Sequence, residues 1–141
     1  MKAASRVYTS GLLLVSACTG GPDPGPIPIV EATISAVQEA LLDGRTTCRS
    51  VVEQHLDRIA TFDYQINAIT VLNPRATERA DSIDQAIAAR SDLGSLFCVP
   101  MLVKDNFDTH DMVTTGGSIA LIESVPPDDA FMVRRIREEG A

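Results

Sequence analysis

The feature that most restricts the fold is an unbroken apolar run at residues 97–103, which ends at Lys104. The run shows no alternation between apolar and polar side chains, which is typical of a strand covered on both faces in an α/β sheet. Pro100 cannot donate a hydrogen bond to a neighbouring strand, so we expect it near the start of this strand. The run therefore predicts an α/β domain with a layered sheet.

A helical pattern begins the globular part of the chain near Glu31. Thr33 is a candidate N-cap, and Gly44 follows the last turn as a C-cap residue. The apolar residues that recur on one face are Ile34, Val37 and Leu41. This spacing predicts an amphipathic helix between Thr33 and Gly44.

A second helical pattern follows directly. Thr46 or Thr47 can cap it, and Ser50 opens a rival capping box with Glu53. Its apolar stripe consists of Val52, Leu56 and Ile59. The choice among these caps stays open from the sequence alone.

The next segments alternate between strand and helix patterns. Residues 67–72 are rich in β-forming side chains and predict a strand. Asn73 and Pro74 then open a third helix, which we expect to run to about Ala89. Its inward positions are Ala76, Ala80, Ile83 and Ile87. A last helix from Ala130 to about Glu139 can be capped by Asp128 or Asp129.

Two predicted strands and four predicted helices make an incomplete sheet, because a stable sheet normally has about four to six strands. After a helix that finishes at Gly140, the next element in an α/β pattern should be a strand. We therefore expect the 141 residues to be the first part of a longer domain, with residues 31–141 as its amino-terminal fragment.

The amino-terminal sequence is typical of a targeting signal and is not expected to be part of the folded domain. Residues 1–18 combine Lys2 and Arg6 with an apolar stretch that contains no acid, which is the pattern of an export signal. The apolar stretch is shorter than the about 20 residues that span a bilayer. Residues 15–18 also resemble a bacterial lipobox, in which Cys18 would receive a diacylglycerol.

A Pro/Gly-rich segment at residues 19–30 follows and would act as a tether between a membrane and a domain. The alternative is ordinary secretion with cleavage after Ala17, and both interpretations place the mature protein outside the cytoplasm. There Cys48 and Cys98 could oxidise together, although the sequence leaves open whether they come within reach.

Charge and spacing argue against two classes of site. With 12 Lys and Arg against 19 Asp and Glu, the chain has a net charge of −7 and no basic stripe, so we expect no nucleic-acid partner. The two His and three Cys form none of the short metal-binding spacings. We therefore expect neither a dedicated metal site nor a metal cofactor.

Lys104 is the residue with the clearest chemical interest. It stands at the carboxyl end of the predicted strand, the edge of an α/β sheet where ligands bind, and a lysine in a partly dry site can act as a base. Alternatively it marks the exit of the strand into solvent, neutralised by Asp105 or Asp108. The turn at residues 114–118 could present N–H groups to an anion but is typical of an ordinary turn, and His110 is expected to be a solvated loop residue.

Residues 99–106, together with Asp108, Thr109 and the segments Met112–Ser118 and Ser124–Phe131, closely resemble the opening block of the amidase signature family. The resemblance covers essentially everything after the tether. It implies the amino-terminal portion of the amidase-signature fold, a mixed β-sheet flanked by helices. It also implies a hydrolase of carboxamide C–N bonds that uses a Ser, cis-Ser, Lys triad on a small amide substrate, with no organic cofactor.

In this resemblance Lys104 matches the catalytic lysine, whereas both serines of the family lie beyond the chain end, so the chain alone is expected to be inactive. The family usually carries Gly where this chain has Cys98. The alternative hypothesis is a non-catalytic exported lipoprotein or interaction module derived from an amidase. Neither the particular amide nor the oligomeric state follows from the sequence.

Overall fold

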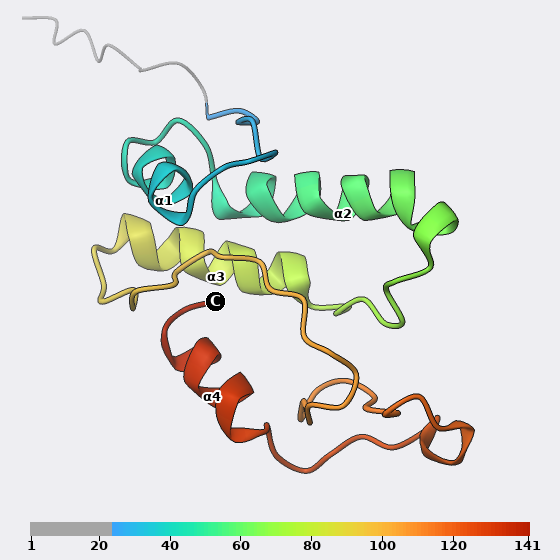
Figure 1. Cartoon of the computed structure of the whole chain (residues 1–141). Helices are drawn as coiled ribbons and strands as arrows, with labels where there is room; N and C mark the ends of the chain where they lie inside the picture. The colour runs from blue at the N-terminus through green and yellow to red at the C-terminus, as the bar shows by residue number, and fades with distance from the viewer. Residues whose placement is uncertain (1–23) are drawn as a thin grey trace, which may run out of the picture.

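The computed structural model describes residues 24–141, in which every regular element is a helix and the rest of the chain is irregular (Figure 1). The helices are α1 (Ile34–Leu42), α2 (Cys48–Ile66), α3 (Ala76–Ala88), the short 3₁₀ helix η1 (Ile119–Leu121) and α4 (Phe131–Glu138). The predicted export signal at 1–18 with Cys18, and residues 19–23 of the predicted tether, lie outside the described part. Within that part, every helix is too short or too polar to cross a bilayer.

Helix α1 begins and ends at the residues that the sequence predicts. The Thr33 hydroxyl oxygen accepts a hydrogen bond from the backbone N–H of Ala36 at 3.1 Å, which makes Thr33 the N-cap. At the other end, the N–H of Arg45 donates to the carbonyl of Ala40 at 2.9 Å while Gly44 adopts a φ of +70°. This is a Schellman turn, in which Gly supplies the left-handed backbone.

Helix α2 begins with Thr47 as its cap, so one of the two threonine predictions is confirmed and the rival capping box at Ser50 is wrong. The Thr47 hydroxyl accepts from the N–H of Ser50 at 3.1 Å. The Asp84 carboxylate, from α3, accepts from the N–H groups of Cys48 and Arg49 at 2.7 and 3.0 Å. Three N–H groups that the helix itself leaves unpaired are satisfied in this way.

Helix α3 starts at Ala76, three residues after the predicted cap at Asn73. The Asn73 side chain accepts instead from the N–H of Arg75 at 2.9 Å, which closes a turn ahead of the helix. The predicted inward face is confirmed at three of its four positions: Ala80 is buried and Ile83 and Ile87 pack against the core, whereas Ala76, half-buried, is not part of the core.

The core lies where α1, α2 and α3 meet the segment around residue 97 (Figure 1). Its buried members are Val37, Leu41, Cys48, Val51, Ala80, Phe97 and Cys98. Cys48 and Cys98 form a disulfide bond with their Cα atoms 5.7 Å apart. The two cysteines are therefore close enough to pair, which the sequence left open. The bond joins α2 to a segment fifty positions further along the chain.

The two predicted strands do not form within residues 24–141, where both segments are irregular. Residues 67–72 connect α2 to α3, and residues 97–103 run outward from the core, with Leu102 78 % exposed. A strand needs a neighbour along its whole length to pair its N–H and C=O groups, and within residues 24–141 such pairing is limited to the start of the apolar run, where the N–H of Cys98 donates to the Gly140 carbonyl. The expected burial of the apolar run on both faces is therefore wrong for these residues beyond Cys98.

Helix α4 ends against the segment that precedes Lys104. The N–H groups of Leu96 and Cys98 donate to the carbonyls of Glu139 and Gly140 at 2.8 and 3.0 Å. The two backbones cross so closely that a methyl group on Gly94 would lie 2.5 Å from the Glu139 carbonyl oxygen. The helix itself starts one residue later than predicted and has no side-chain cap.

Candidate active site around Lys104

Lys104 lies exposed at the end of the irregular segment that leaves the core at Cys98. Its carbonyl accepts a hydrogen bond from the N–H of Phe107 at 3.0 Å, so the chain turns immediately after the lysine. A shallow hollow of about 50 Å³ adjoins it, and its lining includes Val71, Asp105, Thr109 and Thr114. The lysine thus stands at the rim of a small pocket built by the loop that follows it.

Asp105 does not neutralise Lys104. Its carboxylate accepts hydrogen bonds from the hydroxyl of Thr115 and, at 2.8 Å, from the N–H of the same residue. The bond from the Thr115 hydroxyl is the main reason that the pKa of Asp105 lies below its usual range. Within the described residues Lys104 forms no ion pair, with Asp108 or any other carboxylate, so the predicted neutralisation by these neighbours is wrong.

The glycine pair at 116–117 forms a turn against Asp105. Gly116 and Gly117 have φ values of +57° and +77°, and the N–H of Gly116 donates to the Asp105 carbonyl at 2.7 Å. The N–H of Gly117 donates to the Thr115 hydroxyl oxygen at 3.0 Å. The N–H groups of residues 115–117 are therefore taken up by Asp105 and Thr115, and the N–H of Thr115 faces a carboxylate of the chain itself.

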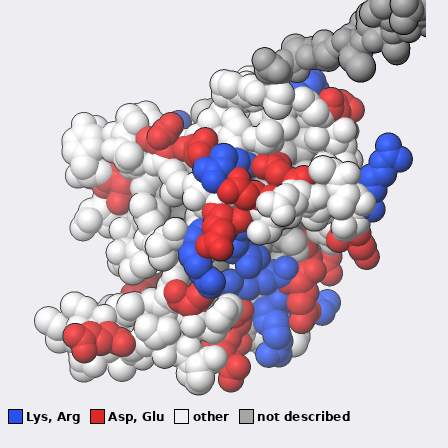
Figure 2. All heavy atoms as spheres, turned by 180° about the vertical axis from the view of Figure 1, so that it is seen from behind, with Lys and Arg blue, Asp and Glu red and all other residues white. Residues whose placement is uncertain are grey.

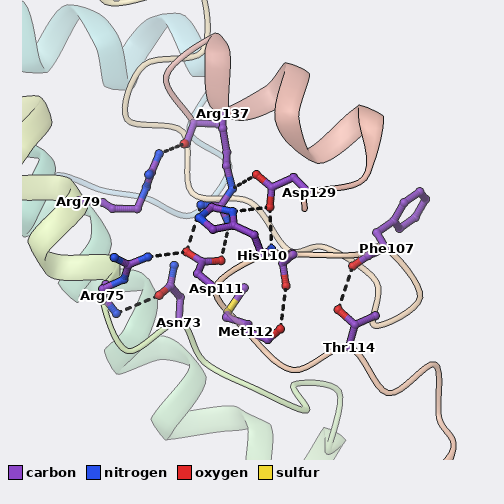
Figure 3. Close-up of polar contacts among 12 residues, drawn as sticks. Asn73, Arg75, Arg79, Phe107, His110, Asp111, Met112, Thr114, Asp129 and Arg137 are labelled. Atoms are coloured by element: carbon purple, nitrogen blue, oxygen red, sulfur yellow. Dashed lines mark hydrogen bonds and ion pairs between the residues drawn. The ribbon is translucent and has the colours of Figure 1, made fainter. Parts of the chain in front are cut away.

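An ion-pair cluster anchors the loop after Lys104 to two helices (Figure 3). Asp111, whose side chain is only 5 % exposed, pairs with Arg137 of α4 at 2.6 Å and with Arg75 before α3 at 3.1 Å. Hydrogen bonds from Arg137 are the main reason that the pKa of Asp111 falls to about 2. The loop is thus held between α3 and α4 by one carboxylate.

Asp129 completes this cluster. The prediction that Asp128 or Asp129 caps α4 is wrong, because the helix has no side-chain cap. The Asp129 carboxylate pairs with Arg137 Nε at 3.2 Å and accepts from the N–H of His110 at 2.9 Å. His110 is an exposed loop residue, as predicted, and its Nδ1 lies 2.8 Å from the same carboxylate, a contact that the sequence did not indicate. Burial alone would raise the pKa of Asp129, but the bonds from His110 and the charge of Arg137 together lower it.

His110, Asp111 and Asp129 place their ligand atoms within 4.8 Å of one another, the one such grouping among residues 24–141. The guanidinium of Arg137 already pairs with both carboxylates, and a further cation there would meet its positive charge. The arrangement is therefore best described as a structural ion-pair cluster. Sequence reasoning missed it because Asp111 and Arg137 lie 26 positions apart and no short spacing links them.

A second cavity, larger than the hollow beside Lys104, lies elsewhere. It measures about 570 Å³ and lies between the ends of α3 and α4, with a lining that includes Ser82, Leu93, Gly94, Phe97 and Glu138. Lys104 is not among its lining residues. On the face shown in Figure 2, basic side chains alternate with acidic ones and form no broad patch of one sign.

Comparison with known proteins assigns the chain to a family. The family model described as Amidase matches residues 50–141. A Schizosaccharomyces pombe protein whose name assigns it to the amidases is 39 % identical over 116 residues, which cover 82 % of this chain and 20 % of that protein. A glutamyl-tRNA(Gln) amidotransferase subunit from Bdellovibrio bacteriovorus is 37 % identical over 77 % of this chain and 22 % of its own length.

Solved structures agree. The native peptide amidase from Stenotrophomonas maltophilia superposes with a TM-score of 0.77 and 34 % identity, over 82 % of this chain and 24 % of that one. The chain therefore belongs to the amidase family. It spans about a fifth to a quarter of the length of these relatives.

Proposed function

We propose that this chain is the amino-terminal portion, residues 31–141, of an amidase that hydrolyses carboxamide C–N bonds. Lys104 serves as its base. The observation that carries the proposal is the position of Lys104 in a member of the amidase family, at the rim of a pocket and without an ion pair in the described residues. Asp105, the nearest carboxylate in sequence, is instead held by Thr115.

The mechanism follows the triad that the amidase signature implies. A neutral Lys104 takes a proton from a bridging serine, which deprotonates the nucleophilic serine as that oxygen attacks the amide carbon. An amine or ammonia leaves, and water hydrolyses the acyl-enzyme. Both serines are proposed to lie outside the present 141 residues.

The same proposal accounts for the exposed apolar segments. Residues 67–72 and 97–103 become strands of a mixed sheet once further chain lies beside them, which buries Leu102 and Leu72. The hydrogen bonds that Leu96 and Cys98 donate to Glu139 and Gly140 support this, because they bring the chain after α4 alongside the start of the apolar run.

The substrate class is a small or peptide-like carboxamide. Peptide amidase is among the similar solved structures, whereas the similar amidotransferase is named for a tRNA-linked substrate. The net charge of −7 disfavours a tRNA partner, because nucleic-acid phosphates repel an acidic surface. The export proposed below disfavours a tRNA partner as well.

We further propose that the protein is exported, anchored by a lipid on Cys18 or secreted. The buried Cys48–Cys98 disulfide supports export, because disulfides form and persist in oxidising compartments. The tether at residues 19–30 would then separate the domain from the membrane.

An assay of ammonia release from simple and peptide amides tests the proposal. The chain of 141 residues should release no ammonia. A longer protein, extended along the same reading frame to the length of the relatives, should release ammonia catalytically. Activity of the 141-residue chain alone would contradict the placement of the serines. A continued, folded protein that hydrolyses no carboxamide would favour a non-catalytic envelope protein derived from an amidase.

A further inference from the structure

Cys98 holds a backbone conformation that disfavours any residue with a side chain. Its φ is +56°, in the left-handed region, where a Cβ atom crowds the following carbonyl. Cys98 is also almost completely buried, at 3 % exposure, so the strain lies in the core and not in a free loop. Such a conformation persists only where the surroundings enforce it.

Cys98 is held from its side chain by the disulfide bond to Cys48. Cys48 is the first residue of α2, is 1 % exposed, and donates its N–H to the Asp84 carboxylate at 2.7 Å. The bond therefore ties Cys98 to a point that α2 and α3 already fix jointly. The N–H of Cys98 adds a hydrogen bond to the Gly140 carbonyl at 3.0 Å.

The segment beyond Cys98 has few other attachments. Residues 99–104 form neither helix nor strand, and Met101, Leu102 and Lys104 are all exposed. Within the described chain, the backbone groups of residues 100–104 take part in one backbone–backbone hydrogen bond, which the Lys104 carbonyl accepts from the N–H of Phe107. The course of this segment is therefore set at its start, by Cys98, and at its end, by the loop that Asp111 anchors.

We propose that the Cys48–Cys98 disulfide is a positioning crosslink, which holds residue 98 in the left-handed conformation and so directs the segment that carries Lys104. Cys48 and Cys98 are then positioning residues, which act through the backbone and touch no substrate. The part that concerns catalysis rests on the function proposed above for Lys104.

The crosslink makes the position of this segment depend on oxidation. Its formation removes two protons and two electrons from the thiols of Cys48 and Cys98. The electron acceptor is a disulfide of a protein or of glutathione in the oxidising compartment to which the chain is exported, and this disulfide is itself reduced to two thiols. Reduction by dithiothreitol runs the exchange backwards, with the reagent ending as a cyclic disulfide.

The test uses the 141-residue chain with Cys18→Ser, so that Cys48 and Cys98 are the remaining thiols. We expect Cys48→Ala to lower the melting temperature by about 10 °C and to abolish its response to dithiothreitol. Adding Cys98→Gly to Cys48→Ala should recover several degrees, because Gly takes a φ of +56° without strain. The matched control, Val99→Gly in the same background, should lower the melting temperature further.

Hydrogen exchange by NMR tests the positioning itself. In Cys48→Ala the amide of Cys98 should exchange at least ten times faster relative to that of Val51, whose N–H bonds to the Thr47 carbonyl within α2. If this variant does not fold, the comparison is made on the parent chain before and after reduction. Equal acceleration at Cys98 and Val51, or no recovery with Cys98→Gly, would overturn the proposal.

In the protein continued to the length of its relatives, Cys48→Ala should lower kcat for carboxamide hydrolysis several-fold while KM stays within two-fold. Addition of Cys98→Gly should restore part of kcat. A rise in KM alone would overturn the link to Lys104. Absence of any amidase activity would instead refute the proposed function, and the exchange experiment would still decide whether the crosslink positions the segment.

Discussion

At the scale of single residues, Asp111 and Arg137 make the most consequential contact in the loop after Lys104. Asp111 is nearly buried and receives two hydrogen bonds from Arg137, at 2.6 and 3.1 Å, besides the one from Arg75. A carboxylate this enclosed needs its partners, because an unpaired buried charge is strongly destabilising. The pair therefore fixes the loop that closes the Lys104 pocket.

Replacement of Asp111 by Asn should cost about 2 kcal/mol of stability at neutral pH, because neutral amides make weaker bonds to guanidinium groups. The folded pKa of Asp111 is about 2, below the about 3.9 of an unfolded aspartate, so its contribution is complete above pH 4 and is lost as the pH falls toward 2. Thermal unfolding of both proteins between pH 7 and 2 measures this.

The difference between parent chain and Asp111→Asn should shrink steadily over that acid range. Asp57→Asn is the matched control, since Asp57 is exposed on α2, and it should differ from the parent by less than about 0.5 kcal/mol at any pH. A difference for Asp111→Asn that stayed constant down to pH 2 would show that the ion pair is not what stabilises the loop.

At the scale of elements, the crossing between residues 94–98 and the end of α4 determines where α4 lies. Gly94 lies where a Cβ atom would meet the Glu139 carbonyl at 2.5 Å, and Ser95 holds the Glu139 carboxylate through its N–H and hydroxyl at 3.0 and 2.7 Å. These contacts, rather than an N-cap, position α4 beside the segment that leads to Lys104.

Two alanine substitutions separate steric crossing from backbone preference. Gly94 and Gly44 share a φ of +70°, but a Cβ atom at Gly44 meets nothing within 4 Å. Gly44→Ala should therefore cost about 1 kcal/mol, the ordinary penalty of a left-handed residue. Gly94→Ala should cost at least about 3 kcal/mol, because backbone must also move. Urea unfolding followed by circular dichroism measures both, and equal losses would contradict the close crossing.

At the scale of the whole molecule, structural features that depend on neighbouring residues in the sequence could be predicted, whereas features that depend on distant segments could not. Thr33, Gly44 and Thr47 act within one turn of a helix, and Ala80 follows helical spacing, so the helices are found near their predicted places. The predicted strand at 97–103 depends on neighbours along its whole length, and residues 24–141 supply one only at its start, where Cys98 bonds to Gly140. The pairing of Asp111 with Arg137 likewise depends on how distant segments meet.

The role of Lys104 is also a property of the whole molecule. Its identity as a candidate came from a motif, since V-P-x-L-V-K-D-N places a lysine at the end of an apolar run. The structure adds that this lysine forms no ion pair among the described residues, and the family assignment adds the chemistry. The central claim is that this side chain is the base of an amidase.

The most direct measurement is the rate of ammonia release by the protein continued to the length of its relatives, with Lys104→Ala compared against the parent. Loss of a general base predicts a fall in kcat of about 10³-fold or more, with the melting temperature nearly unchanged. Arg45→Ala removes an exposed cation whose partner among residues 24–141 is Asp43, and it should leave the rate unchanged. A Lys104→Ala protein that hydrolyses amides at near-parental rates would contradict the account.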